Sequence, residues 1–130
     1  MESQLYSKKA VLLHILKEMI EACDLITLWN ADIANANVYP QSPAGMKTMA
    51  ASCMLIESIG EGVKKFDKLV PGYLVLQKPA IPWKNIMGLR DRIAHGYFNL
   101  DADIIFDVAV NEIPVIRKNL EEIKSKLEEL

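Results

Sequence analysis

The sequence predicts an all-α fold, an up-and-down bundle of four main helices in a single domain that spans residues 1–130. Two observations predict it. Apolar residues recur at intervals of three and four over most of the chain, which is the spacing of a helix with one buried face. The 130 residues, half of them apolar and a quarter charged, are enough for one hydrophobic core but few for two.

The first two predicted helices are long. One extends from about residue 5 to 29, and its apolar stripe consists of Leu12, Leu16, Met19, Cys23 and Ile26. The other extends from about residue 44 to 67 and is apolar on two sides, as expected of a helix with several neighbours. It contains Gly60 and Gly62, which lower helix propensity. We expect both glycines to allow the close approach of another backbone.

The second half of the chain predicts two further helices. The third begins near Pro82, since proline is tolerated in a first turn, and ends near His95. The fourth begins after Asp101 or Asp103, either of which can cap it, and Pro114 should kink it. The connectors are long. One of them contains YLVLQ, which can form a short strand but has no other predicted strand to pair with.

Composition excludes several classes of protein. The net charge of −2 means that any binding of nucleic acid must come from a local basic patch. No apolar run is long enough to span a bilayer, and charges recur through the N-terminal helix, so we expect a cytoplasmic protein without a signal peptide. Cys23 and Cys53 are expected in the core as free thiols. The histidines and cysteines form no metal-ligand cluster, although a magnesium ion held by carboxylates stays open.

One stretch, GLRDRIAHGYFNLD at residues 88–101, stands apart from this pattern. Gly96 suits the left-handed conformation that ends helices, which predicts His95 at or near the end of the third helix. A histidine there interacts favourably with the helix dipole, so the stretch has a purely structural interpretation. The alternative is a functional site that contains Arg90, Asp91, His95 and Tyr97. Spacing alone does not decide between the two.

The residues Arg90, His95 and Tyr97 resemble the R-x4-H-x-Y motif of HepT-like proteins, the toxins of HEPN/MNT toxin–antitoxin pairs. The similarity extends over about residues 50–125. LIESIGEGVKKF is similar to the second long helix of that family, IPWKNIMGLRDRIAHGYFNLD to its motif block, and IIFDVAVNEIPVIRKNLEEI to its last helix. The segment 28–47 departs from the common family pattern.

The resemblance implies a HEPN-like bundle that acts as a homodimer and as a metal-independent endoribonuclease toxin, without a cofactor. It implies catalytic roles for Arg90 and His95, with Asp91 orienting one of them. A histidine can act as base or acid near neutral pH, and an arginine can bind phosphate oxygens. Since one chain supplies a single histidine in the motif, an acid–base pair of histidines requires two subunits, and His14 lies on a different predicted helix.

The resemblance also implies a partner. In this family a minimal nucleotidyltransferase antitoxin transfers AMP to the motif tyrosine, here Tyr97.

Four further residues are candidates for supporting roles. Glu57 or Glu61 can position Arg90, and Arg92 and Lys84 can bind RNA phosphates. Ordinary surface positions are the alternative for each of them. The alternative function is a non-catalytic helical module that holds a nucleotide or a nucleotidyltransferase.

Overall fold

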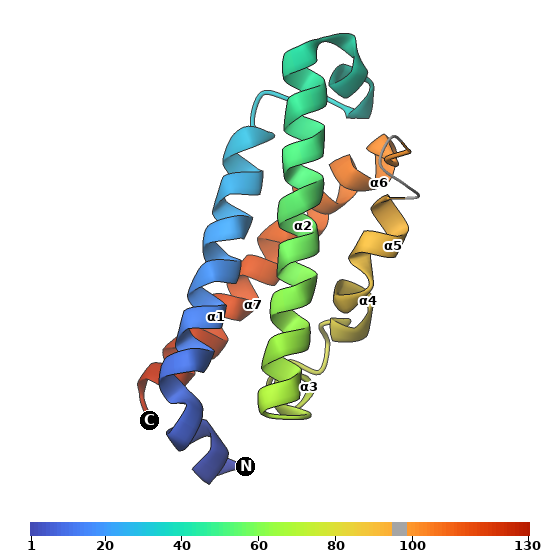
Figure 1. Ribbon diagram of the computed structural model, residues 1–130. Helices are drawn as coiled ribbons and strands as arrows, with labels where there is room; N and C mark the ends of the chain where they lie inside the picture. The colour runs from blue at the N-terminus through green and yellow to red at the C-terminus, as the bar shows by residue number, and fades with distance from the viewer. Residues whose placement is uncertain (95–98) are drawn as a thin grey trace.

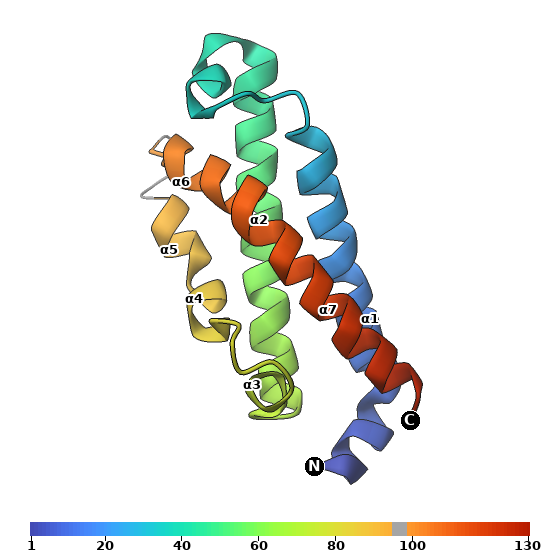
Figure 2. The same cartoon turned by 180° about the vertical axis from the view of Figure 1, so that it is seen from behind.

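The computed structural model describes residues 1–94 and 99–130, and it confirms the all-α bundle. Three long helices dominate it: α1 (Glu2–Trp29), α2 (Pro43–Leu69) and α7 (Ile113–Glu128). Figure 1 shows α1 and α2 side by side in opposite directions, with α7 behind them. The view from behind shows α7 crossing both helices at an angle (Figure 2). Within the described residues the only β-type pairing is an isolated bridge between Ala94 and Leu100.

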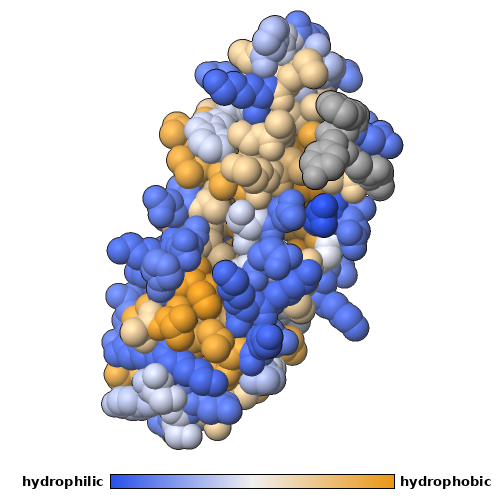
Figure 3. All heavy atoms as spheres, viewed as in Figure 1, coloured by the Kyte–Doolittle hydropathy of each residue, from blue (hydrophilic) through white to orange (hydrophobic). Residues whose placement is uncertain are grey.

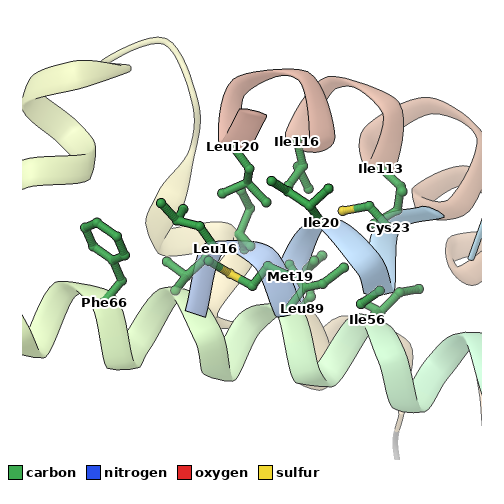
Figure 4. Packing of buried hydrophobic residues seen from close by; sticks show 14 of the residues in the cluster. Leu16, Met19, Ile20, Cys23, Ile56, Phe66, Leu89, Ile113, Ile116 and Leu120 are labelled. Carbon is green, nitrogen blue, oxygen red and sulfur yellow. The ribbon is translucent and has the colours of Figure 1, made fainter. Parts of the chain in front are cut away.

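The hydrophobic core lies where α1, α2 and α7 meet. The predicted stripe of α1 is buried, and Leu12, Leu16, Cys23 and Ile26 have no exposed surface. Figure 4 shows side chains of α1 packed between Ile56 of α2 on one side and Ile113, Ile116 and Leu120 of α7 on the other. The two cysteines are free and buried, as expected. Burial raises the pKa of Cys23 to about 12 and also raises that of Cys53, because a thiolate is poorly solvated there.

The connector between α1 and α2 is ordered by a buried hydrogen-bond network. It contains a 3₁₀ helix, η1 (Ala36–Gln41), whose Tyr39 is fully buried. The Tyr39 hydroxyl donates to Oδ1 of Asn30 at 2.6 Å, and Nδ2 of Asn30 donates to Oγ of Ser52 at 2.9 Å. The Tyr39 ring also meets Phe106 edge-on. The hydrogen bonds anchor the connector to α2, and the ring contact anchors it to α6.

The predicted third helix is divided into short pieces. Residues of the YLVLQ stretch form α3 (Tyr73–Gln77), so the possible strand was wrong. A single helix from Pro82 to His95 was also wrong: α4 (Trp83–Met87) and α5 (Leu89–Ile93) are separated at Gly88. The amide of Gly88 donates to the carbonyl of Asn85, three residues back, which is the tighter bonding of a 3₁₀ turn. The break turns α5 relative to α4, and both lie along α2 (Figure 1).

The last part of the chain is helical throughout, but not regular. Helix α6 (Ala102–Asp107) is capped by Asp101, whose side chain accepts from the amide of Ile104 at 3.1 Å. It passes into a π-helical segment, η2 (Val108–Glu112), and then into α7. Pro114 therefore lies in the first turn of α7 rather than in a helix interior as predicted. The irregular part of the helix is the π-helical segment, whose turns are wider than those of an α-helix, and it ends just before Pro114.

None of the helices in the described ranges is both long enough and apolar enough to cross a membrane.

Candidate active site

Helix α5 carries the first part of the motif and is fixed by two buried side chains. Leu89 and Ile93 lie one turn apart, and neither has exposed surface. Because they point into the core, the residues between them point outward: Arg90 and Asp91 are exposed, and Arg92 is half-buried. The burial pattern therefore presents the polar side chains of the motif to solvent on a helix that is held by the core.

The side chain of Arg90 lies against α2. Its Nε is 3.4 Å from Oε1 of Glu57, and both side chains are substantially exposed. Glu61, one turn further along α2, forms an ion pair with Lys64 instead, at 3.3 Å. Of the two glutamates singled out in the sequence, Glu57 is the one next to Arg90. An exposed ion pair of this kind contributes little to stability, but it orients the guanidinium.

Arg92 points to the opposite side of α5 and contacts the π-helical segment. Its two terminal nitrogens lie 3.4 and 3.2 Å from the two carboxylate oxygens of Glu112. This paired geometry is the one that a guanidinium and a carboxylate prefer. Arg92 is thus bound to Glu112 rather than presented as a free phosphate ligand. Sequence reasoning did not single out Glu112, because it lies 20 residues away and its neighbours show no motif.

Helix α5 ends at Ile93, near the position that the sequence predicted. Ala94 is extended, with φ −132° and ψ 119°, and it closes the short bridge to Leu100. Ala94 is therefore the C-cap of α5. His95, Gly96 and Tyr97 lie outside the described residues. The amide of Asp101 donates to the carbonyl of Ile93 at 2.9 Å, so the chain returns beside the end of α5.

The position of α4 and α5 depends on Gly60. A Cβ atom at this position would lie 2.8 Å from the carbonyl oxygen of Ile86, closer than real Cβ contacts. The expectation that Gly60 allows another backbone to approach is therefore confirmed. For Gly62 it was wrong, because the group beside it is the side chain of Met19 rather than a backbone. Gly60 sets how closely the motif-bearing segment packs on α2.

Other candidate groups lie elsewhere. His14 is exposed on α1, where Nε2 lies 3.0 Å from Oε1 of Glu18. Among residues 1–94 and 99–130, no group of three or more histidine, cysteine or acidic side chains is close enough to hold a metal ion. Lys84 is exposed on α4.

A groove runs between α1 and α2 on the same side of the molecule as Glu57. Its volume is about 610 Å³, and its floor is apolar, with Met19, Leu25 and Leu55 among the lining residues. Its charged lining residues are Glu18, Glu21, Glu57, Glu61 and Lys65, so the groove is mainly acidic. Since Glu57 lines this groove and also contacts Arg90, the groove and the motif share one continuous surface.

Comparison with known proteins identifies the family. A family model described as "Ribonuclease HepT-like" matches residues 16–123, which include α5 and most of the bundle. The chain belongs to the HepT-like family. The resemblance seen in the motif and its flanks is therefore confirmed, and the match extends to α1 as well.

Curated relatives of this HepT-like protein carry ribonuclease names. "Putative RNase MJ0127" of Methanocaldococcus jannaschii is 33% identical over 97 residues, 75% of this chain and 77% of the relative. "Putative RNase MJ0125" of the same organism is 40% identical over 57% of this chain and 60% of the relative. "Probable ribonuclease HepT" of Thermococcus cleftensis is 26% identical over 84% and 92% of the respective chains. No solved structure matches the chain significantly.

Proposed function

We propose that this HepT-like ribonuclease cleaves RNA without a metal ion, at a site built from Arg90 and His95 of two identical subunits. The observation that carries the proposal is the position of Arg90 in a chain of this family. Its guanidinium is exposed on a helix that the core fixes, and Glu57 holds it from one side. A phosphate can reach it from solvent without any rearrangement of the bundle.

The chemistry requires three groups. A base removes the proton of the ribose 2′-hydroxyl, an acid protonates the leaving 5′-oxygen, and a cation stabilises the charge that develops on the phosphate. A histidine side chain can act as base or acid near neutral pH, so His95 suits the first two roles, and Arg90 is suited to the third. Since each chain contributes one motif histidine, the base and the acid come from two subunits. Asp91, exposed beside Arg90, orients Arg90 or His95 in this proposal.

The proposal includes silencing at Tyr97 by a separate nucleotidyltransferase, which makes the protein the toxin of a toxin–antitoxin pair. Tyr97 follows His95 by two residues in the sequence. Transfer of AMP forms a phosphodiester between the phenolic oxygen and the α-phosphate of ATP, and pyrophosphate leaves. The product adds negative charge and bulk next to the groups that bind an RNA phosphate, so it opposes binding of the substrate.

The test is RNA cleavage by the purified chain in the presence of EDTA. We expect cleavage by the wild type and its loss in Arg90→Ala and in His95→Ala. Arg117→Ala is the matched control, because Arg117 is a partly exposed arginine of α7 that is ion-paired with Asp24. Cleavage by both motif variants at the wild-type rate would contradict the proposal. Saturable nucleotide binding by a chain that cleaves no RNA would favour the alternative, a non-catalytic binding module.

Silencing is tested separately by intact mass after co-expression with a cognate nucleotidyltransferase. We expect the wild type to gain AMP units and to lose cleavage. Tyr97→Phe should gain none, whereas Tyr6→Phe, which alters a tyrosine exposed on α1, should gain them like the wild type. Modification that persists in Tyr97→Phe would refute Tyr97 as the acceptor.

A further inference from the structure

The charges around Arg90 are distributed unevenly, so that two of the directions leading away from it are unfavourable for a polyanion. On one side lies the α1–α2 groove, whose charged lining consists of four glutamates and a single lysine. On another side lie α6 and η2, and residues 91–112 contain five acidic side chains. The one cation in that range is Arg92, which is already paired with Glu112. An RNA strand bound at Arg90 is repelled in both directions.

The third direction, along α2 towards α3, is basic. Residues 64–84 extend from the last turns of α2 to α4 and contain five lysines and one aspartate, in a chain whose net charge is −2. Two of these lysines are paired with glutamates, Lys64 with Glu61 and Lys78 with Glu122. The region remains positive when both glutamates are counted. It is therefore the local basic patch that an acidic chain needs in order to bind nucleic acid.

One line of residues on α2 leads from Arg90 into this region. Glu57 contacts Arg90. The residues that follow Glu57 on the same face of α2, at intervals of four, three and four, are Glu61, Lys64 and Lys68. Both lysines are exposed, and they lie about 10.5 Å and about 16.5 Å from Glu57 along the helix axis. Figure 3 shows hydrophilic residues over this lower half of α2.

Lys84 adds a third cation from α4. Helix α2 and the segment that contains α4 and α5 run in opposite directions (Figure 1), and Gly60 lies against the carbonyl of Ile86. Lys64 follows Gly60 by one turn and Lys84 precedes Ile86 by two residues, so the two lysines lie within about 3 Å of one height along α2. Lys84 is exposed as well. We call Lys64, Lys68 and Lys84 the lysine track.

We infer that the RNA strand extends from Arg90 along the lysine track towards α3. The inference rests on the proposed function, because it takes Arg90 as the group that binds the phosphate at the cleaved bond. A lysine binds a phosphate as a point charge on a flexible stem, and a phosphate contact carries no sequence information. The lysine track therefore contributes affinity for the flanking strand, and it contributes neither base specificity nor chemistry.

The first experiment measures RNA binding in the His95→Ala background, in which the proposed site cuts no RNA. The probe is a fluorescent single-stranded RNA of about 12 nucleotides, and the readout is anisotropy. We expect Lys64→Gln, Lys68→Gln and Lys84→Gln each to weaken binding about fivefold at about 0.1 M salt, because each removes one phosphate contact. The double variant at Lys68 and Lys84 should reduce the slope of log affinity against log salt by about 1.4.

The matched control replaces two exposed lysines on other helices, Lys17 of α1 and Lys118 of α7, by glutamine. It has the same net charge as the double variant at Lys68 and Lys84, and we expect it to bind RNA like the parent. Equal weakening in the two double variants would overturn the inference. Urea denaturation verifies that both are folded, since Lys68 also lies in the last turn of α2, where a cation stabilises the helix dipole.

The second experiment restores His95 and varies the length of the substrate. With a long RNA, the double variant at Lys68 and Lys84 should raise KM and leave kcat nearly unchanged, because the lysine track binds the flanking strand in substrate and transition state alike. With a dinucleotide, which contains only the cleaved bond, this variant and the wild type should have the same kcat/KM. An equally large loss with the dinucleotide would show that the lysines act at the cleaved bond itself and would overturn the inference.

The inference and the proposed function can fail separately. RNA binding that depends on the lysine track, in a chain that cleaves no RNA, supports the track and contradicts the proposed function. Cleavage by the wild type in EDTA, together with a double variant at Lys68 and Lys84 that behaves like the control, contradicts the track alone.

Discussion

Arg92 and Glu112 form a two-point contact between the motif helix and the π-helical segment, at 3.4 and 3.2 Å. The contact joins α5 to a part of the chain that is 20 residues away, and it lies on the side of α5 opposite to Arg90. A rigid neighbour on each side of a five-residue helix restricts its rotation. We therefore regard Glu112 as a positioning residue for the proposed RNA site.

Replacing Glu112 tests this role. Glu112→Gln replaces the carboxylate that holds Arg92 by a neutral amide. We expect kcat to fall by about tenfold, because the motif is displaced, and KM to stay nearly unchanged, because the side chains that bind the substrate remain. The free energy of unfolding should change by less than about 1 kcal/mol, since the pair is partly exposed. The reversed pair, Arg92→Glu with Glu112→Arg, should recover part of kcat. An unaltered kcat in Glu112→Gln would show that the contact has no positioning role.

Glu57 is expected to matter through Arg90. Glu57→Gln removes the charge next to the guanidinium, and we expect kcat for RNA cleavage to fall while Glu57→Asp retains part of it. Glu121→Gln is the matched control, because Glu121 has the same exposed fraction, 41%, and also pairs with an arginine. Equal activity of the Glu57 and Glu121 variants in steady-state kinetics would remove Glu57 from the site.

Gly60→Ala should be more destabilising than its neighbour Gly62→Ala. The new methyl group meets the backbone oxygen of Ile86 at 2.8 Å, so α4 and α5 must move outward, at about 1–3 kcal/mol. At Gly62 the group in the way is the flexible side chain of Met19, and the alanine gains helix propensity of about 1 kcal/mol. Urea denaturation of both variants measures the difference. A Gly62 variant less stable than the Gly60 variant would contradict this explanation.

Tyr39→Phe should lower stability in a pH-dependent way. Its hydroxyl donates to Asn30, and its loss leaves a buried acceptor unpaired, which costs about 1–3 kcal/mol. Burial raises the pKa of Tyr39 to about 12, so the unfolded chain loses the phenolic proton first. The stabilisation is therefore complete below the ordinary tyrosine pKa near 10 and is lost as the pH rises towards 12. Urea denaturation at pH 8 and pH 11 should show a smaller difference between wild type and variant at pH 11.

The long helices could be predicted from the sequence because their signal is local. Apolar spacing located α1 and α2 to within three residues at each end, and the cap at Asp101 was among the two positions expected. The short helices could not be predicted in the same way. A helix of five residues spans little more than one turn, so its apolar pattern cannot be told from that of a strand or of a longer helix.

At the candidate site, too, residues with a local sequence signal could be predicted and residues that meet only in the folded chain could not. The motif in the sequence made Arg90 and Asp91 candidates, and the polar side of α2 suggested Glu57. Glu112 was missed because its partner is distant in sequence and the two meet only through tertiary packing. Likewise, the break at Gly88 gives no unambiguous signal, because an isolated glycine is tolerated within a helix.

The shortness of α5 has a consequence for how the protein opens. Isolated helices below about 12 residues are barely stable in water, so the five residues from Leu89 to Ile93 adopt their conformation only while Leu89 and Ile93 are buried in the core. The amide of Ala94, which donates to the carbonyl of Arg90, should then exchange with solvent deuterium by the same opening that exposes the core. A destabilising mutation in the core would therefore speed this exchange beside Arg90, although the mutated residue does not contact Arg90.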